Sequence, residues 1–440
     1  MRNKQIRPLL IAVVLLLGAM QSVAQSAFSI IERDRSFTAG NYGVYPDKDL
    51  PRQTAAPKGY QPFYISHYGR HGSRYLNDMK GYKEPYKTLQ KADSLGKLTA
   101  VGKMALREIK AYIDDAEGRW GDLTDFGSQQ QRDIAHRMLH NFPTVFQHDA
   151  FIDARSTIVT RCALSMGAFM LQLVKERPTL QTSMFNSYSD MWYLNYQNKA
   201  LRDSATNYHA QKAINRFIAK RWRNHRLTNL FFNDSVYVQK HVDLMWTVYY
   251  LIKASLIQQN SQEGLGLNPL LSVFTSEELY VFWQVENAWS YLHSGFCTRN
   301  GGMQPYTQLN LLQKIVSEAD SVIDGKQRGA SLRFGHETVL LPLVCLMGIN
   351  GYDYKTGNLD ELEPKGWWAN LVYPMAGNLQ IVFYRKNAAD KDPLIKVLLN
   401  EKEATLPLSS DLAPYYRWSD VRNFLLKRVA DGQSALGIKR

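Results

Sequence analysis

The stretch YISHYGRHGSRY (residues 64–75) places Arg70, His71 and Arg74 directly behind an apolar run. Burying an unpaired guanidinium group costs several kcal/mol, so two of them beside a histidine at the end of a buried strand need an anion to neutralise them. The neighbouring glycines let the backbone turn sharply at this point. The segment therefore predicts an anion-binding site that contains a histidine.

A second polar group, His336 and Glu337, follows another strand-like segment far downstream, and Arg161 lies between the two groups where a loop meets a predicted helix. The N-terminus of a helix attracts anions, and an arginine adds bidentate contacts to them. Open α/β sheets bind ligands at the carboxyl ends of their strands. We therefore expect these residues to share one crevice, which suits a tetrahedral phosphate.

The elements that must position these residues alternate between strands and helices, which predicts an α/β fold. Strands are expected at residues 62–68, 151–158, 378–384 and 394–400, and in the segment that ends at Gly335. Helices are expected at residues 100–117, 127–141, 159–175 and 418–429, and from Glu337 onward. Residues 25–61 are rich in proline, glycine and turn formers, so we expect them to be irregular.

The middle of the chain has a different pattern. Residues 190–319 carry long aromatic and polar helical patterns, and Thr275 with Glu278 forms a capping-box pattern at the start of one of them. This pattern predicts a mostly helical cap inserted into an α/β domain that is built from residues 25–189 and 320–440. The stretch GLGLNP (residues 264–269) follows no strand, so we interpret it as a loop and not as a dinucleotide-binding turn.

Residues 1–24 combine a basic start, an apolar run and the small-residue site SVA, which is typical of a cleaved secretory signal. The apolar run is short for a membrane span, and no cysteine follows it to take a lipid anchor. The sequence therefore predicts an exported protein, periplasmic or secreted, without a stable membrane anchor. Loss of this segment would lower the formal charge from +13 to +10.

The basic balance favours encounters with polyanions but does not select among them. The cluster KRWRNHR (residues 220–226) is interpreted as a solvated helix face, with steering of a polyphosphate as the alternative. No nucleic-acid-binding motif accompanies it, so no nucleic-acid partner is expected. Cys162, Cys297 and Cys345 are odd in number and lack metal-binding spacing, which argues against a disulfide framework.

The motif RHGSR, followed far downstream by a histidine–acid pair, resembles the histidine acid phosphatase family, branch 2 of the histidine phosphatase superfamily, which includes bacterial phytases and multiple inositol polyphosphate phosphatases. Three further segments support the resemblance. LTDFGSQQ (residues 123–130) is similar to the family's LTxxGxxQ, RCALSMGAF to its RxxxS segment, and HETVLLPLVCLMG to its HDxxLLPLLxxLG. The likeness covers the α/β parts and not the helical middle.

The resemblance implies a phosphoglycerate mutase-like α/β domain and a phosphomonoesterase that works by double displacement without a metal or other cofactor. His71 would be the nucleophile, and Glu337 would protonate the leaving alcohol. Nearby cations keep a histidine neutral, as a nucleophile must be, and they stabilise the charge of phosphoryl transfer. The residues that would bind the phosphate are Arg70, Arg74, Arg161 and His336.

One position departs from the family pattern. Most members have Asp directly after the second histidine and the multiple inositol polyphosphate phosphatases have HAE, whereas this chain has HET. Glu337 supplies a carboxyl group at the Asp position, and its alternative role is to favour the dipole at the start of a helix. The sequence therefore does not decide between the members that have Asp at this position and the multiple inositol polyphosphate phosphatases.

The leading hypothesis is an exported phosphatase acting on phosphorylated small molecules, with inositol polyphosphates (phytate) as one possible substrate. A broad-specificity acid phosphatase or a sugar phosphatase is the alternative within the family. A non-catalytic phosphate-binding protein is the alternative from another class. The presence of both His71 and a carboxylate at position 337 favours the enzyme, because a binding protein needs neither. The oligomeric state is not indicated.

Overall fold

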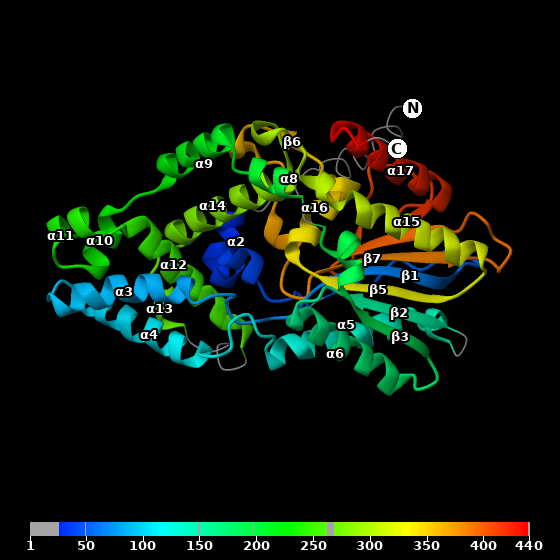
Figure 1. Cartoon of the computed structure of the whole chain (residues 1–440), viewed down its shortest axis with the longest axis horizontal. Helices are drawn as coiled ribbons and strands as arrows, with labels where there is room; N and C mark the ends of the chain where they lie inside the picture. Colours follow the sequence, from blue (N-terminus) through cyan, green and yellow to red (C-terminus); the bar gives the residue numbers. More distant parts are fainter. Residues whose placement is uncertain (1–25, 49, 148–149, 197, 262–267, 439–440) are drawn as a thin grey trace, which may run out of the picture.

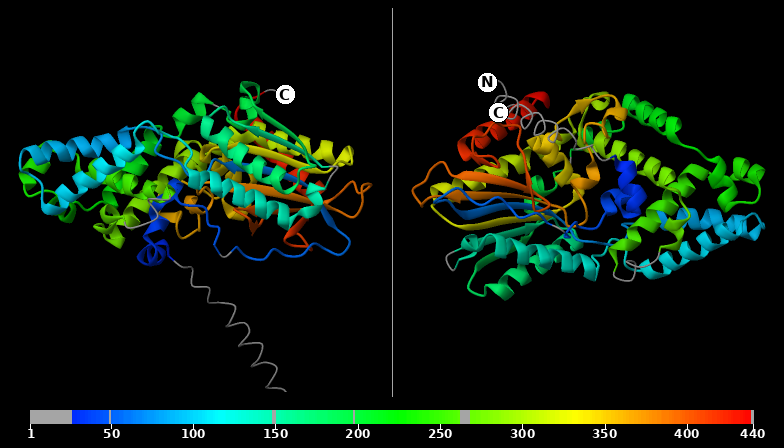
Figure 2. Two further views of the ribbon diagram at one scale, coloured as in Figure 1. Left: turned by 90° about the horizontal axis from the view of Figure 1, so that it is seen from below. Right: turned by 180° about the vertical axis from the view of Figure 1, so that it is seen from behind.

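The computed structural model describes residues 26–48, 50–147, 150–196, 198–261 and 268–438. The predicted signal segment, residues 1–24, lies outside the described residues, as does most of the GLGLNP stretch. The molecule is elongated, with a twisted sheet at one end and a helical region at the other (Figures 1 and 2).

The main sheet is mixed and has the strand order β10-β8-β7-β1-β5-β2-β3, with β9 paired to β8. Strands β1, β5, β2 and β3 are parallel, whereas β7, β8 and β10 are added in antiparallel pairs. The strands of this sheet are β1 (Gln61–Arg70), β2 (Phe151–Ser156), β3 (Gln181–Asn186), β5 (Gly329–Gly335), β7 (Asn378–Arg385), β8 (Leu394–Leu399), β9 (Lys402–Ala404) and β10 (Tyr415–Arg417). A separate parallel pair joins β4 (Phe296–Cys297) to β6 (Lys355–Thr356).

Helices cover both faces of this sheet, which explains why β5, β7 and β8 are buried along their whole length. Helices α5 (Asp125–Asn141) and α6 (Thr160–Glu176) lie on one face (Figure 1). Helices α15 (Leu309–Asp324), α16 (Glu337–Met347) and α17 (Trp418–Ala435) lie on the other. Two separate apolar cores result, one on each side of the sheet.

The helical region has a third apolar core of its own. It includes helices from the middle of the chain and also α3 and α4, which come from before β2 and pack against α12 and α10 (Figure 1). The helices outside the sheet layers are α2 (Ala27–Arg33), α3 (Lys80–Ser94), α4 (Ala100–Ala116), α7 (Met191–Leu194), α8 (Lys199–Ser204), α9 (Tyr208–Arg221), α10 (His225–Phe231), α11 (Ser235–His241), α12 (Leu244–Ile257), α13 (Pro269–Ser272) and α14 (Ser276–Ser294).

The predicted fold class, an α/β domain with a mostly helical cap, is confirmed. The predicted strands and helices of the α/β part form with ends close to those expected, and the capping box of Thr275 and Glu278 is present. The expectation that residues 25–61 are irregular is wrong in part. Ser26 caps α2 and Asp34 caps a 3₁₀ segment (Arg35–Tyr42), because both elements gain a buried face against α14. The division at residues 190 and 319 stays a prediction.

Candidate active site

The two polar groups identified in the sequence lie side by side because their strands are neighbours. Strands β1 and β5 are parallel neighbours, with Arg70 paired to Gly335, so both strands end at the same edge of the sheet. The backbone N–H of His71 donates to the carbonyl of Gly335 (3.0 Å). The imidazole rings of His71 and His336 are 5.8 Å apart between centroids. The expected convergence of the two groups thus follows from strand adjacency.

Helices α5 and α6 hold the loop that follows β1. A Cβ atom added to Gly72 would lie 2.1 Å from the carbonyl oxygen of Gly127 on α5, so the two backbones can approach only with glycine at this position. The N–H of Gly72 donates to the hydroxyl of Ser165 on α6 (3.1 Å). The amide of Gln131 donates to the carbonyl of Arg70 (2.9 Å). These contacts explain why the LTDFGSQQ and RCALS segments belong to the site.

Arg70 is fully buried, and hydrogen bonds to its Nη1 atom fix the position of the guanidinium group. Its Nη1 donates to the carbonyls of Asn41 and Tyr373, at 2.6 Å each. Its Nε lies 3.1 Å from Oε2 of Glu337. Its Nη2 has no hydrogen-bond partner among the described residues. A buried guanidinium N–H without a partner is costly, so the geometry suits an anionic ligand at Nη2.

Arg74 and Arg161 add two more guanidinium groups. Arg74 is 2% exposed, and its Nη1 donates to the carbonyl of Tyr75 (2.8 Å). Arg161 lies in the first turn of α6, and both burial and the charge of Arg74 lower its pKa. In the described part of the chain, the Nε atoms of both arginines are buried without a hydrogen-bond partner. Three arginines therefore present unsatisfied donors in one place.

His71 is positioned to react through Nε2. Its Nδ1 lies 2.9 Å from the carbonyl oxygen of Gly72, which assigns the proton to Nδ1 and leaves the lone pair on Nε2. Nε2 is buried and has no hydrogen-bond partner among the residues described. Burial, followed by the charges of Arg70 and Arg74, lowers the pKa of His71 well below its usual value. The ring is therefore neutral and available as a nucleophile even in mild acid.

His336 is also neutral. Burial lowers its pKa to about 4, and the charge of Arg161 adds to this effect. Its Nε2 lies 3.2 Å from the hydroxyl of Thr157. Its backbone N–H donates to the hydroxyl of Tyr68 (3.2 Å), which fixes the turn between β5 and α16. His336 can therefore donate or accept a hydrogen bond at the site without adding charge.

Glu337 begins α16, and its side chain is 18% exposed. Its Oε2 lies 3.9 Å from Nε2 of His71. Burial alone would raise the pKa of Glu337, but the charges of Arg70 and Arg74 outweigh that effect and hold the pKa well below its usual range. Glu337 is thus a carboxylate while no anion is bound, which differs from the protonated state that a proton donor needs.

Three possible metal ligands lie close together at this site. The ligand atoms of His71, His336 and Glu337 are within 4.8 Å of one another, which is a spacing that could hold a metal ion. The three neighbouring guanidinium groups disfavour a second cation there by direct repulsion, and Arg70 already contacts the carboxylate. The residues suit an anion better.

Lys253 lies near the candidate site, and the sequence analysis did not identify it. It lies on α12, with its Nζ 5.4 Å from the centre of the Tyr42 ring, and Arg74 packs over that ring at 5.7 Å. The helical region thus places a second cation on the ring that packs against Arg74. The available signal was a single lysine inside the apolar helix YYLIKASLI.

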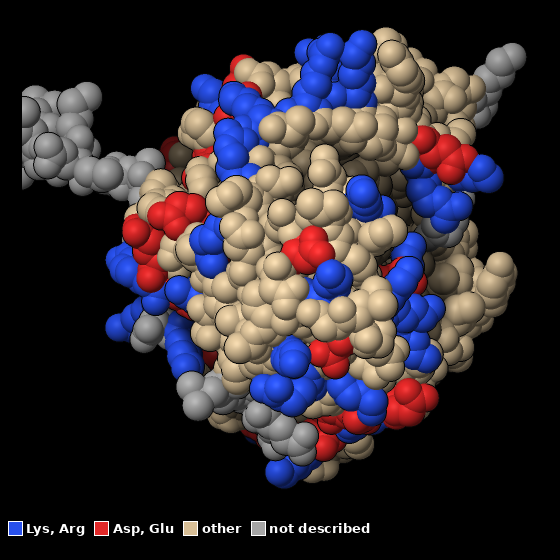
Figure 3. All heavy atoms as spheres, turned by 90° about the vertical axis from the view of Figure 1, so that its left-hand side faces the viewer, with Lys and Arg blue, Asp and Glu red and all other residues tan. Residues whose placement is uncertain are grey.

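Other polar features lie outside this cluster. His67 packs between Phe169 and Phe334, and burial lowers its pKa to about 3, so it is a core residue. In the basic stretch at residues 220–226, Lys220 and Arg221 both pair with Asp360. Figure 3 shows Lys and Arg in several groups over the helical end, with Asp and Glu between them. The three cysteines are free and buried.

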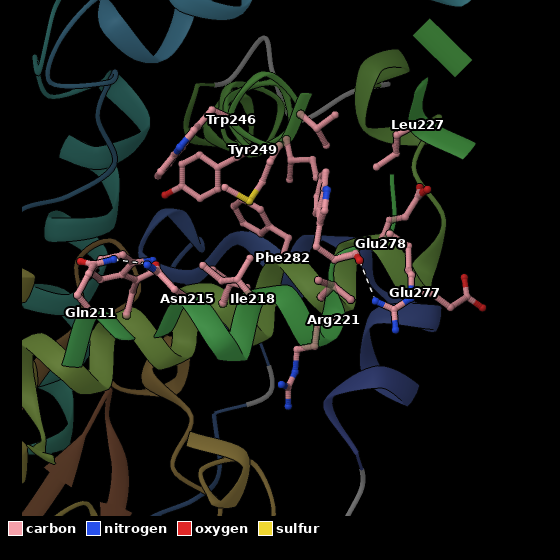
Figure 4. A pocket seen from close by; sticks show the side chains of 18 residues that line it. Gln211, Asn215, Ile218, Arg221, Leu227, Trp246, Tyr249, Glu277, Glu278 and Phe282 are labelled. Atoms are coloured by element: carbon pink, nitrogen blue, oxygen red, sulfur yellow. Dashed lines mark hydrogen bonds between the residues drawn. The ribbon is translucent and has the colours of Figure 1, made fainter. Parts of the chain in front are cut away.

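The helical region also encloses a cavity of about 370 Å³ between α9, α12 and α14 (Figure 4). Apolar and aromatic side chains such as Ile218, Tyr249 and Phe282 line most of it, and the amide of Gln211 donates to Asn215 at one end (2.9 Å). None of the predicted site residues lines this cavity, so it is distinct from the anion site.

Known proteins match both the sequence and the fold. Residues 69–400 match the histidine phosphatase superfamily (branch 2). The chain is 24% identical over 394 residues to multiple inositol polyphosphate phosphatase 1 of Homo sapiens, covering 80% of this chain and 77% of that protein.

Two solved structures share the fold. The Bifidobacterium longum multiple inositol polyphosphate phosphatase in complex with inositol hexasulfate has a TM-score of 0.74 at 17% identity, covering 88% of this chain and 97% of that one. The D. castellii phytase has a TM-score of 0.68 at 15% identity, covering 96% and 92%. The family match, which spans most of the chain and includes the RHGSR and HET segments, confirms the expected relationship: the chain belongs to branch 2 of the histidine phosphatase superfamily and is a phosphatase.

Proposed function

We propose that the protein hydrolyses phosphate monoesters of small molecules through a phosphohistidine at His71, with inositol polyphosphates as the substrate class. One observation carries the proposal. A buried imidazole with a free Nε2 lone pair lies among Arg70, Arg74 and Arg161, whose unsatisfied N–H groups need an anion.

In the first step, Nε2 of His71 attacks phosphorus, and the bond from phosphorus to the alcohol oxygen breaks. The arginines stabilise the negative charge on the three other phosphate oxygens. The leaving oxygen takes a proton from Glu337. In the second step, the carboxylate of Glu337 takes a proton from water, which attacks the phosphohistidine and releases inorganic phosphate and neutral His71.

The charge of the bound phosphate prepares Glu337 for this role. Arg70 and its neighbours keep the carboxyl group ionised in the free site. A phosphate group between these arginines offsets their positive charge, so the pKa of Glu337 rises when substrate binds. The proton enters with a monoanionic phosphate or from solvent, because the side chain is partly exposed. Glu337 thus becomes a proton donor only in the substrate complex.

The substrate class rests on two supports. The relatives are named for inositol polyphosphates and phytate. In this chain, Lys253 of the helical region packs on the same Tyr42 ring as Arg74, and its ammonium group could pair with a second phosphate of a polyphosphorylated ring. A broad acid phosphatase or sugar phosphatase is the alternative, and it has no need of this additional cation.

Chemical trapping tests the mechanism. Purified wild-type protein mixed with labelled substrate and quenched should carry a base-stable, acid-labile phosphate, and His71→Ala should carry none and lose nearly all turnover. Phosphate should still protect His71→Ala against thermal unfolding, because the three arginines remain. Label on a serine, or residual activity above a few per cent in the variant, would refute the role of His71. A wild-type protein that binds phosphate but releases none from any substrate would support the non-catalytic binding protein.

Phosphate release compared across phytate, glucose 1-phosphate, nucleotides and p-nitrophenyl phosphate tests the substrate class. We expect kcat/KM to be highest for phytate and to fall for phytate alone in Lys253→Met. Equal values for all four substrates would favour the broad-specificity alternative.

Export and domain organisation remain part of this proposal. The pattern of residues 1–24 supports a secretory signal. The third apolar core supports a helical cap that uses much of residues 190–319, and it also includes residues of α2, α3 and α4, which precede that range. Within the residues that the structure describes, no helix is long and apolar enough to cross a membrane. N-terminal sequencing of the mature protein after expression would test the cleavage at residue 24.

A further inference from the structure

A cluster of three metal-binding side chains lies on the outer surface of the sheet-covering helices α5 and α6, separate from the anion site. His136 and His140 lie one turn apart on α5, and Glu176 is the last residue of α6. Residues four apart on a helix share one face, so both imidazoles project toward the same neighbour. The three ligand atoms lie within 4.8 Å of one another.

The carboxylate of Glu176 lies between the two rings. Nδ1 of His136 is 2.8 Å from Oε1, and Nε2 of His140 is 2.9 Å from Oε2. The ring centroids are 4.2 Å apart. The amide of Gln172, one turn earlier on α6, donates to Oε1 (2.6 Å) and helps to orient the carboxylate. Each ring therefore directs one nitrogen at the same carboxylate group.

These distances suit a divalent transition-metal ion after a small adjustment. Bonds of about 2.0–2.2 Å to nitrogen and oxygen place neighbouring ligands of a tetrahedral ion roughly 3.4 Å apart. The two histidine side chains are 52% and 55% exposed, so their rings are free to rotate and bring the nitrogens to these distances. Two imidazoles with one carboxylate favour Zn²⁺, with water in the fourth position, over Ca²⁺ or Mg²⁺, which prefer all-oxygen sites.

We propose that His136, His140 and Glu176 form a surface Zn²⁺ site that links α5 to α6. Both helices hold the loop after β1, through Gln131 on α5 and Ser165 on α6. A metal that joins their C-terminal ends stabilises this pair of helices without touching the reacting atoms. The proposal is independent of the proposed substrate, and it predicts an effect of Zn²⁺ on stability and none on the chemistry.

The test uses the untagged full chain, stripped with EDTA and dialysed, and titrated calorimetrically with Zn²⁺ alone. The variants are His140→Ala and Glu176→Gln, which each remove one ligand, and the control is His209→Ala, an exposed histidine on α9. A further control is His71→Ala, which removes one ligand from the cluster of His71, His336 and Glu337 at the candidate active site. We expect one Zn²⁺ per chain in wild type, His209→Ala and His71→Ala, and binding at least tenfold weaker in His140→Ala and Glu176→Gln.

Two further measurements separate a metal site from a simple ion-pair cluster. Zn²⁺ should raise the Tm of wild type and slow amide exchange at the C-terminal ends of α5 and α6, with neither effect in Glu176→Gln, while kcat/KM for p-nitrophenyl phosphate stays constant. Wild type that binds no Zn²⁺ at millimolar concentration, equal affinity in His140→Ala, or loss of binding in His71→Ala would each overturn the proposal.

Discussion

Replacing Glu337 with Gln tests whether this residue is the proton donor, because the effect should depend on the leaving group. An alkoxide leaves poorly unless it is protonated as the P–O bond breaks, whereas p-nitrophenolate leaves readily without a proton. Gln keeps the size of the side chain and its place at the start of α16 but cannot supply the proton. The loss should therefore be large for an inositol phosphate and small for p-nitrophenyl phosphate.

The expected magnitudes have two parts. A general acid contributes roughly a hundredfold to ten-thousandfold, which is about 2.7–5.5 kcal/mol of the barrier for the inositol phosphate, and the loss for p-nitrophenyl phosphate should be at least about tenfold smaller. Glu337 is a carboxylate in the free site and lies 3.9 Å from Nε2 of His71, so an anion that binds there meets repulsion unless Glu337 takes up a proton. Glu337→Gln carries no charge at this position and should therefore bind inorganic phosphate more tightly than wild type.

The assay measures kcat/KM for both substrates and the inhibition constant of phosphate in wild type, Glu337→Gln and Glu84→Gln. Glu84 is an exposed carboxylate on α3 and serves as the matched control for loss of one negative charge. Thermal unfolding of each protein shows whether the start of α16 remains intact. Equal losses on the two substrates would mean that Glu337 only positions the pocket or favours the helix dipole. Unchanged phosphate inhibition would show that the charge of Glu337 does not oppose the binding of an anion.

Three further predictions follow from the same structure. Gly72→Ala should cost at least about a hundredfold in kcat/KM and about 1–3 kcal/mol in the free energy of unfolding, because its Cβ would overlap the carbonyl of Gly127. Gly167→Ala lies inside α6 and meets no atom within 4 Å, so it should leave kcat/KM unchanged and raise the free energy of unfolding by up to about 1 kcal/mol. Burial lowers the pKa of His67 to about 3 and that of His336 to about 4, so below pH 6.5 the unfolded chain binds more protons than the folded chain. The free energy of unfolding should therefore fall by up to about 1.4 kcal/mol per pH unit for each histidine as the pH is lowered. A free energy of unfolding in urea that is the same at pH 7 and pH 5 would contradict this. Activity on p-nitrophenyl phosphate should survive EDTA, because the arginines supply the positive charge, and a loss that a divalent ion restores would argue for metal-assisted chemistry.

Much of the α/β part is predictable from local sequence. Strand β1 ends in the GRHGSR turn, and β5 is followed at once by His336 and the helix that begins at Glu337. Apolar runs with glycine at their ends reveal such strands without any knowledge of their partners. The candidate residues were therefore identifiable from types and spacing, although their convergence depended on β1 and β5 being neighbours.

The segment before β1 and the helices α3 and α4 show where local sequence is insufficient to predict structure. The proline, glycine and turn formers of residues 25–61 predict irregular structure. Helix α2 and the 3₁₀ segment nevertheless form there, because both pack against α14. Helix α3 was not predicted, and α4 was predicted without its location, since nothing local indicates that a helix from before β2 packs with α10 and α12. Contacts between distant segments decide such elements.

The charge states at the site were decided only by tertiary structure. The sequence by itself determined that His71, Glu337 and the arginines are present and follow strand ends, which was enough to predict an anion-binding phosphatase site. It did not determine that Arg70 contacts Glu337 at 3.1 Å or that His71 donates from Nδ1 to Gly72. Protonation depends on burial and on charges a few ångströms away, and those distances are set by packing between segments far apart in the chain.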